Sequence, residues 1–326
     1  MNRQLKKNRV TVPVMLRTAR IVVELVAGVV ITVAAAGCAS FLPGFAAWLE
    51  RIQIFPAVMG FAMVTFVSWL LITLLFGRVY CSTVCPLGLL QDVVARVPRL
   101  TAKSRARHRY AYRRPVSRLQ YLVLTLTLVG MMAGLSFVAQ LLDPFTVYVG
   151  IVKNVGHTAV EAAEAGLSPL GHATGWWSLT AHDRIIACSL SAFAVDAVVL
   201  VLVAVSAALS GRTLCNSICP VGTTLGFVSR YAVMQVDIDT DKCIHCGKCE
   251  DVCKASCIDL HDCTVDGSRC VDCFDCLAVC PNDAIHYTGR RHQLSDVLMQ
   301  RVGGARRTTG QATPTAMNTP NHISKQ

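Results

Sequence analysis

The C-terminal third of the sequence contains two complete runs of closely spaced cysteines. The runs are Cys243-x2-Cys246-x2-Cys249-x3-Cys253 and Cys270-x2-Cys273-x2-Cys276-x3-Cys280-Pro281. Thiolates at this spacing wrap around cubane iron–sulfur clusters, which exchange single electrons. A zinc ribbon would have two separated Cys-x2-Cys pairs instead, so the eight cysteines favour two [4Fe–4S] clusters.

The ligands of each cluster follow from the way such runs are used. In ferredoxins with two clusters, the fourth cysteine of each run ligates the cluster of the other run. The first cluster is therefore predicted to bind Cys243, Cys246, Cys249 and Cys280. The second is predicted to bind Cys270, Cys273, Cys276 and Cys253.

The first run departs from the usual pattern in two ways. Lys254 stands where a proline usually follows the fourth cysteine, and Cys257 comes only four residues after Cys253. Cys263 is also unassigned. The sequence leaves open whether Cys257 and Cys263 are spare, tune a cluster or replace a ligand, although spacing favours Cys253 as the fourth ligand.

A different cysteine pattern occurs twice upstream, each time directly after a long apolar run. The copies are Gly77-Arg78-x2-Cys81-x3-Cys85-Pro86-x-Gly88 and Gly211-Arg212-x2-Cys215-x3-Cys219-Pro220-x-Gly222. Helix residues four apart lie about 6 Å apart on one face, so each pair offers two ligands to a metal. Two pairs together make a four-thiolate site that suits zinc or an iron–sulfur cluster. The alternatives are a redox-active dithiol in each copy and a structural turn set by the prolines.

The apolar runs predict a membrane protein. Hydrophobic residues make up 53% of the chain and charged residues 16%, against roughly 25% charged in soluble domains. Four windows have about the 20 residues that a spanning helix needs: Ile21–Cys38, Phe55–Phe76, Tyr121–Leu142 and Ile185–Leu209. A cleaved signal peptide is the alternative for the first window, but its length and late start favour a spanning helix.

Basic residues predict the orientation, because short loops rich in Lys and Arg stay in the cytoplasm. Six lie within the first 20 residues and ten between Gly77 and Arg118, whereas the other two connections hold three in total. Both chain ends are therefore predicted to be cytoplasmic, with the connection Asp143–Arg184 on the outer side of a bacterial inner membrane. The net charge of +11 then reflects topology and lipid headgroups and argues against nucleic-acid binding.

The predicted fold class is a membrane bundle of four helices in two repeated hairpins, followed by an α+β domain with two clusters. In that domain, Met234–Ile238 and Asp283–Tyr287 read as short strands, and a short helix is expected over Cys249–Lys254. The predicted organisation is a basic cytoplasmic segment at 1–20, a membrane domain at 21–232 with the cysteine–proline segments at 77–88 and 211–222, a ferredoxin domain at 233–290 and a disordered polar tail at 291–326.

Together these motifs resemble a known family. Four spans, two cytoplasmic Gly-Arg-x2-Cys-x3-Cys-Pro-x-Gly segments and a C-terminal double-cluster ferredoxin resemble the NapH-type membrane ferredoxins, the quinol dehydrogenase component associated with periplasmic nitrate reductase. NosR-type and RdxA/CcoG-type membrane ferredoxins are similar. The resemblance covers about residues 15–290. It implies electron transfer between the quinol pool or a cytoplasmic donor and a respiratory reductase partner, without specifying nitrate.

Few residues of the predicted spans could handle protons in quinol chemistry. Asp196 is the main candidate for a catalytic role, because an intramembrane carboxyl is costly and often functional; the alternative is a carboxyl held by a neighbouring helix. Gln91 and Asp92 follow the first cysteine–proline segment, where a quinone headgroup could approach, but a solvated helix start is the favoured interpretation. The alternative function class is a redox-dependent assembly or regulatory factor for a respiratory metalloenzyme.

The histidines argue against haem in the membrane domain. All nine lie outside the four apolar windows, so no haem b held by two histidines is expected between the spans. They are His108, His157, His172, His182, His245, His261, His286, His292 and His322.

Overall fold

The computed structural model describes residues 2–36, 53–54, 63–101, 110–134, 140–156, 158–160 and 190–289. The chain divides after His292, and the following account concerns the unit before that point. The predicted tail at 291–326 lies outside the described residues, as do Cys38 and Cys188.

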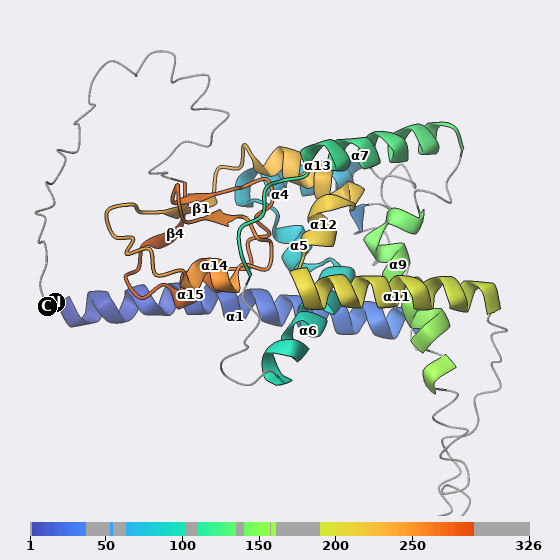
Figure 1. The fold of residues 1–326 in the computed structure, drawn as a ribbon, viewed down its shortest axis with the longest axis horizontal. Helices are drawn as coiled ribbons and strands as arrows, with labels where there is room; N and C mark the ends of the chain where they lie inside the picture. Colours follow the sequence, from blue (N-terminus) through green and yellow to red (C-terminus); the bar gives the residue numbers. More distant parts are fainter. Residues whose placement is uncertain are drawn as a thin grey trace, which may run out of the picture. The chain divides into compact units, whose positions relative to one another are not determined.

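Four long helices correspond to the four apolar windows (Figure 1). They are α1 (Asn2–Ala35), α4 (Met63–Phe76), α7 (Ser117–Met132) and α11 (Leu190–Ser210). Within α1, the segment Pro13–Ala35 has 23 residues, and α11 has 21, so both are long and apolar enough to cross a membrane. Helices α4 and α7 are apolar but have only 14 and 16 residues. The described residues therefore support two of the four predicted spans by length.

The apolar side chains of these helices are largely exposed. Only 11% of the apolar window of α11 is buried, and Val198, Val201 and Leu202 are each at least 59% exposed. The corresponding window of α1 is 28% buried. These faces are not covered by the rest of the described chain.

The duplicated sequence folds twice in the same way. After α4 come α5 (Val79–Thr83) and α6 (Pro86–Thr101), and after α11 come α12 (Thr213–Ser217) and α13 (Pro220–Ser229). Gly77 and Gly211 follow the long helices with φ of 76° and 65°, the left-handed conformation that commonly ends a helix. Each proline of the repeat begins the next helix, where its missing N–H costs nothing.

The two copies are interlocked. Helix α6 contacts α1 and α11, and helix α13 contacts α7 and α4. Helix α6 follows the first cysteine–proline segment and packs against α11, the long helix that precedes the second segment. Helix α13 follows the second segment and packs against α4, the long helix that precedes the first. This exchange brings the two copies together.

The segment after the third window begins with helical structure. Within the predicted connection Asp143–Arg184, the described residues form helix α9 (Pro144–Gly150) and a π-helix, η2 (Ile151–Gly156). Asp143 caps α9 by accepting a hydrogen bond from the Thr146 amide at 2.7 Å. Helix α9 contacts α6, and η2 contacts α11. Phe145 and Tyr148 of α9 are buried in a cluster with Ile31 of α1.

The C-terminal part has the expected α+β form. Strand β1 (Gln235–Ile238) pairs antiparallel with β4 (Ile285–Thr288), so both predicted strands are confirmed with slightly shifted ends. A second pair joins β2 (Ile258–Asp259) and β3 (Thr264–Val265). The short helices α14 (Lys248–Val252) and α15 (Asp275–Val279) contact each other, and α15 contacts α1 (Figure 1).

This α+β part is bonded to the end of α4. The Val233 amide donates to the Leu74 carbonyl at 2.8 Å, and the Tyr287 hydroxyl donates to the Phe76 carbonyl at 2.8 Å. The start of β1 and the edge strand β4 are thereby fixed to the helix that leads into the first cysteine–proline segment.

Candidate iron–sulfur sites

Each predicted set of four ligands lines its own cavity. The first cavity is lined by Cys243, Cys246, Cys249 and Cys280. The second is lined by Cys253, Cys270, Cys273 and Cys276, together with Cys257. The fold therefore brings the fourth cysteine of each run to the other run, as the ligand exchange requires. All fourteen cysteines among the described residues are free, so their thiols are available to iron.

The backbone reverses at matched positions in the two runs. His245 and Asp272 have φ of 51° and 49°, and Gly247 and Phe274 have φ of 76° and 59°. The left-handed conformation costs about 1–2 kcal/mol for a residue with a side chain. The fold keeps it because the chain must wrap around one centre to direct successive thiols inward.

The two unassigned cysteines lie beside predicted ligands. The sulfur of Cys257 is 3.6 Å from that of Cys253, and Cys257 lines the same cavity as Cys270. The ligand atoms of Cys263, Cys243 and His245 lie within 4.8 Å of one another. Neither extra cysteine is a remote packing residue.

The four cysteines of the cysteine–proline segments are all buried, at 7–9% exposure. Burial raises the pKa of Cys85, and repulsion from the other three thiols raises it further, so the four thiols are neighbours. Burial also raises the pKa of Cys215 to about 11.

The spacing of the four thiols also bears on zinc. Two sulfurs on one tetrahedral zinc lie roughly 4 Å apart, given a Zn–S bond of about 2.3 Å. Among the described residues, the group with ligand atoms that close together is Cys243, His245 and Cys263. Within the described part of the chain, no three of the four cysteine–proline thiols form a group this close.

Two buried arginines link the copies reciprocally. Arg212 of the second copy donates from Nη1 to the Cys81 carbonyl at 2.5 Å and from Nη2 to the Gly88 carbonyl at 3.2 Å. Arg78 of the first copy donates to Asn216 Oδ1 at 2.8 Å and lies 3.8 Å from the Cys81 sulfur. Both arginines are 1% exposed, so they place two positive charges beside four thiols.

The last glycine of each copy makes room for these arginines. A Cβ on Gly222 would lie 2.9 Å from Arg78 Nη2, and one on Gly88 would lie 3.3 Å from Arg212 Nη1. The repeated Gly-Arg and Pro-x-Gly elements therefore fit together across the two copies. The sequence contained this signal in the repeat itself, but it did not indicate that each arginine serves the other copy.

Asp92 is the centre of a buried ionic network, which corrects the prediction of a solvated site. Gln91 and Asp92 are 0% and 3% exposed, because α11 packs over this face of α6. Asp92 accepts from Arg212 at 2.8 Å, from Arg20 at 2.9 Å and from Lys254 at 2.9 Å. Burial alone would raise the pKa of Asp92, but Arg212 and Lys254 hold it well below its usual range.

Two further charged residues, Glu24 and Asp275, extend the network. Glu24 pairs with Arg20 and, at 3.0 Å, with Arg212. Asp275 pairs with Lys254 at 3.1 Å. Lys254, which replaces the usual proline, therefore joins the C-terminal α+β part to helix α6.

Asp196 has a partner on the neighbouring segment. Asn154 of η2 donates from Nδ2 to Asp196 Oδ2 at 2.5 Å, and Gly150 allows this approach because a Cβ there would lie 3.0 Å from the carboxylate. The carboxyl is thus held by a neighbouring helix, the alternative reading from the sequence.

Comparison with protein families supports iron–sulfur binding at both kinds of cysteine pattern. A family model described as a 4Fe-4S binding domain matches the chain twice, over residues 58–104 and 192–236. A second 4Fe-4S binding domain model matches residues 236–259. No curated protein and no solved structure gave a significant match. The chain therefore contains ferredoxin-type 4Fe–4S binding domains and is an iron–sulfur electron-transfer protein.

Proposed function

We propose that this protein is anchored in the bacterial inner membrane and passes electrons between the quinol pool, or a cytoplasmic donor, and a respiratory reductase partner. The observation that carries the proposal is a bridge made by Arg20. Its Nε donates to the Ser82 carbonyl at 3.1 Å and its Nη1 to the Cys273 carbonyl at 3.4 Å. One side chain thus connects a cysteine–proline segment with a ligand run of the ferredoxin part.

The ferredoxin part supplies two sites in this proposal. The first uses Cys243, Cys246, Cys249 and Cys280, and the second uses Cys270, Cys273, Cys276 and Cys253. A bound [4Fe–4S] cluster supplies one-electron chemistry. Around the second site, Val236, Val271 and Phe274 are at most 7% exposed and exclude water from the cavity that they line.

The cysteine–proline segments supply a third site in this proposal, either a cluster or another metal centre. Its ligands are Cys81, Cys85, Cys215 and Cys219. The double match of a 4Fe-4S model to these segments supports this assignment. Arg78 and Arg212 offset the negative charge of four thiolates, and the Gly222 amide donates to the Cys219 sulfur at 3.3 Å.

Several features support attachment to a membrane. The apolar faces of α1 and α11 are exposed over lengths that match a bilayer, and soluble proteins rarely expose such large apolar patches. Attachment of the ferredoxin part to the ends of these helices on the basic, cytoplasmic side gives it access to quinol headgroups. Asp196 stays the candidate for proton handling.

Two measurements on the purified protein test this function. In anaerobic stopped-flow mixing with a menaquinol analogue, the visible absorption of the iron–sulfur centres is expected to bleach. Lack of reduction, with or without a reconstituted partner, contradicts the quinol role and favours the assembly or regulatory alternative. Iron analysis is expected to give about twelve irons with a third cubane, against about eight with two. The double variant Cys85→Ala/Cys219→Ala should contain about four irons fewer than a wild type with three cubanes.

A further inference from the structure

The two halves of the ferredoxin part correspond residue by residue, with one chemical difference. Cys253 and Cys280 each follow a short helix with an extended backbone, at ψ of 94° and 115°. Three residues later, Ser256 and Asp283 have φ of 50° and 51°. The next positions are Cys257 in one half and Ala284 in the other.

These two residues occupy equivalent places in the two cavities. Ala284 lines the first cavity and Cys257 lines the second. The first cavity therefore has four thiols in its lining, whereas the second has five. A cubane cluster needs four thiolate ligands, so one thiol of the second cavity is in excess.

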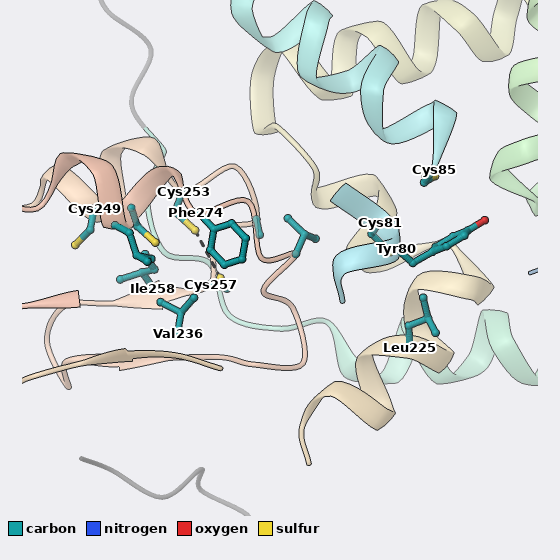
Figure 2. Close-up of a cluster of buried hydrophobic side chains, with 14 of the residues drawn as sticks. Tyr80, Cys81, Cys85, Leu225, Val236, Cys249, Cys253, Cys257, Ile258 and Phe274 are labelled. Carbon is teal, nitrogen blue, oxygen red and sulfur yellow. Dashed lines mark hydrogen bonds between the residues drawn. The ribbon is translucent and has the colours of Figure 1, made fainter. Parts of the chain in front are cut away.

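The extra thiol contacts one of the predicted ligands, Cys253. Figure 2 shows the 3.6 Å contact between the sulfurs of Cys253 and Cys257, with Val236, Ile258 and Phe274 around them. Cys257 is 2% exposed and lines this cavity together with Cys270. If the residue at position 257 only had to fill space, an alanine would be sufficient there, as Ala284 is at the equivalent position of the other half.

We propose that Cys257 is a reserve ligand of the second site: its sulfur can take the coordination position of Cys253. This inference rests on the proposed function, since it assumes a cluster at that site. In the exchange, the Cys257 thiol loses its proton as its sulfur binds iron, and the Cys253 sulfur leaves iron and takes the proton. No electron moves. The direct contact of the two sulfurs gives that proton a short path.

Cys253 is the ligand that such an exchange would replace. It comes from the other run, four residues before Cys257, and follows the end of α14. Cys273 and Cys276, by contrast, are held by the loop and helix of their own run. Cys263 is the weaker candidate for a similar role in the first site, because the described lining of that cavity does not include it.

The test compares iron content and electron paramagnetic resonance spectra of anaerobically purified, full-length variants. Cys253→Ala is expected to keep the wild-type iron content, with altered g-values for the second cluster. Cys253→Ala/Cys257→Ala is expected to lose about four irons. Equal iron content in these two variants, at either level, overturns the reserve role.

A matched control uses the other half of the domain. Cys280→Ala is expected to lose about four irons, because Ala284 offers no thiol; retention of iron there would mean general tolerance and would also overturn the proposal. The signal of the unaltered cluster in each sample reports that the domain has folded. A wild-type protein without these clusters would contradict the proposed function instead.

Discussion

Arg212 donates from Nε to Asp92 Oδ1 at 2.8 Å and thereby joins the two copies of the cysteine–proline repeat. Arg212 belongs to the second copy, and Asp92 lies on the helix that follows the first. Both side chains are at most 4% exposed. Because Lys254 of the ferredoxin part pairs with the same carboxylate, Asp92 holds three separate segments together.

Asp92→Asn should destabilise the protein strongly. The substitution keeps the shape of the side chain but removes the charge that Arg20, Arg212 and Lys254 share. Breaking a buried ion pair from one side costs about 3–5 kcal/mol, and we expect a matching fall in the thermal midpoint in detergent. The control is Asp262→Asn, whose carboxylate is 66% exposed, since exposed pairs contribute about 1 kcal/mol or less. Equal effects of both substitutions would contradict the role of Asp92.

The sequence predicted the sites that depend on local spacing. The x2-x2-x3 pattern predicted which cysteines gather, and the fold brings those eight residues into two cavities. The repeat around Cys81 and Cys215 was visible, and family models match both copies. Local spacing works here because each run must wrap around one centre.

The ionic network could not be predicted in the same way. Asp92 and Arg212 are 120 positions apart, and Glu24 and Arg212 are 188 apart. A charged residue just after a helix start normally faces solvent, so Asp92 looked exposed. Its burial depends on the packing of α11 over α6, and no local sequence pattern predicts that packing. The sequence showed Lys254 only as a departure from the usual proline, because its ion-pair partners lie on other helices, α6 and α15.

Asp143 should make stability depend on pH in the mildly acidic range. Burial raises the pKa of its carboxyl from 3.8 to about 6. The folded state therefore holds the proton more tightly than the unfolded state, so this contribution to stability is complete below pH 3.8 and is lost as pH rises through about 6. The substitution Asp143→Asn would keep an acceptor for the Thr146 amide at this position without a titrating group.

The measurement is the thermal midpoint of wild type and of Asp143→Asn at several pH values from roughly 3.5 to 7. We expect the wild type to lose stability relative to the variant as the pH rises over this range. The difference between the two pKa values of Asp143 corresponds to about 3 kcal/mol in the free energy of unfolding. Parallel curves for the two proteins would show that Asp143 does not titrate in this range.

Asp196→Asn separates proton handling from structure. The amide oxygen can still accept the hydrogen bond of Asn154, so iron content and thermal midpoint should not change. If Asp196 accepts a proton from quinol, the rate of cluster reduction by a menaquinol analogue should fall by about a hundredfold or more. An unchanged rate would remove Asp196 from the mechanism and leave it a purely structural role.

Gly222→Ala should damage the third site while sparing the ferredoxin sites. The added Cβ would lie 2.5 Å from the Cys215 carbonyl and 2.9 Å from Arg78 Nη2. The backbone carbonyl cannot move away without shifting α12, so Cys215 and Cys219 should lose their relative positions. Overpacking of this kind costs about 1–3 kcal/mol.

The control is Gly156→Ala, where the nearest atom to the added Cβ, the Ile151 carbonyl oxygen, is an ordinary 3.8 Å away. We expect Gly222→Ala alone to lower the iron content by about four, toward the level of two clusters, with unchanged resonance signals from the ferredoxin part. Full iron content in Gly222→Ala, or an equal loss in Gly156→Ala, would mean that the fit between Gly222 and Arg78 does not support a cluster. The comparison is informative because both changes add one methyl group, and only the one at Gly222 meets the arginine of the other copy.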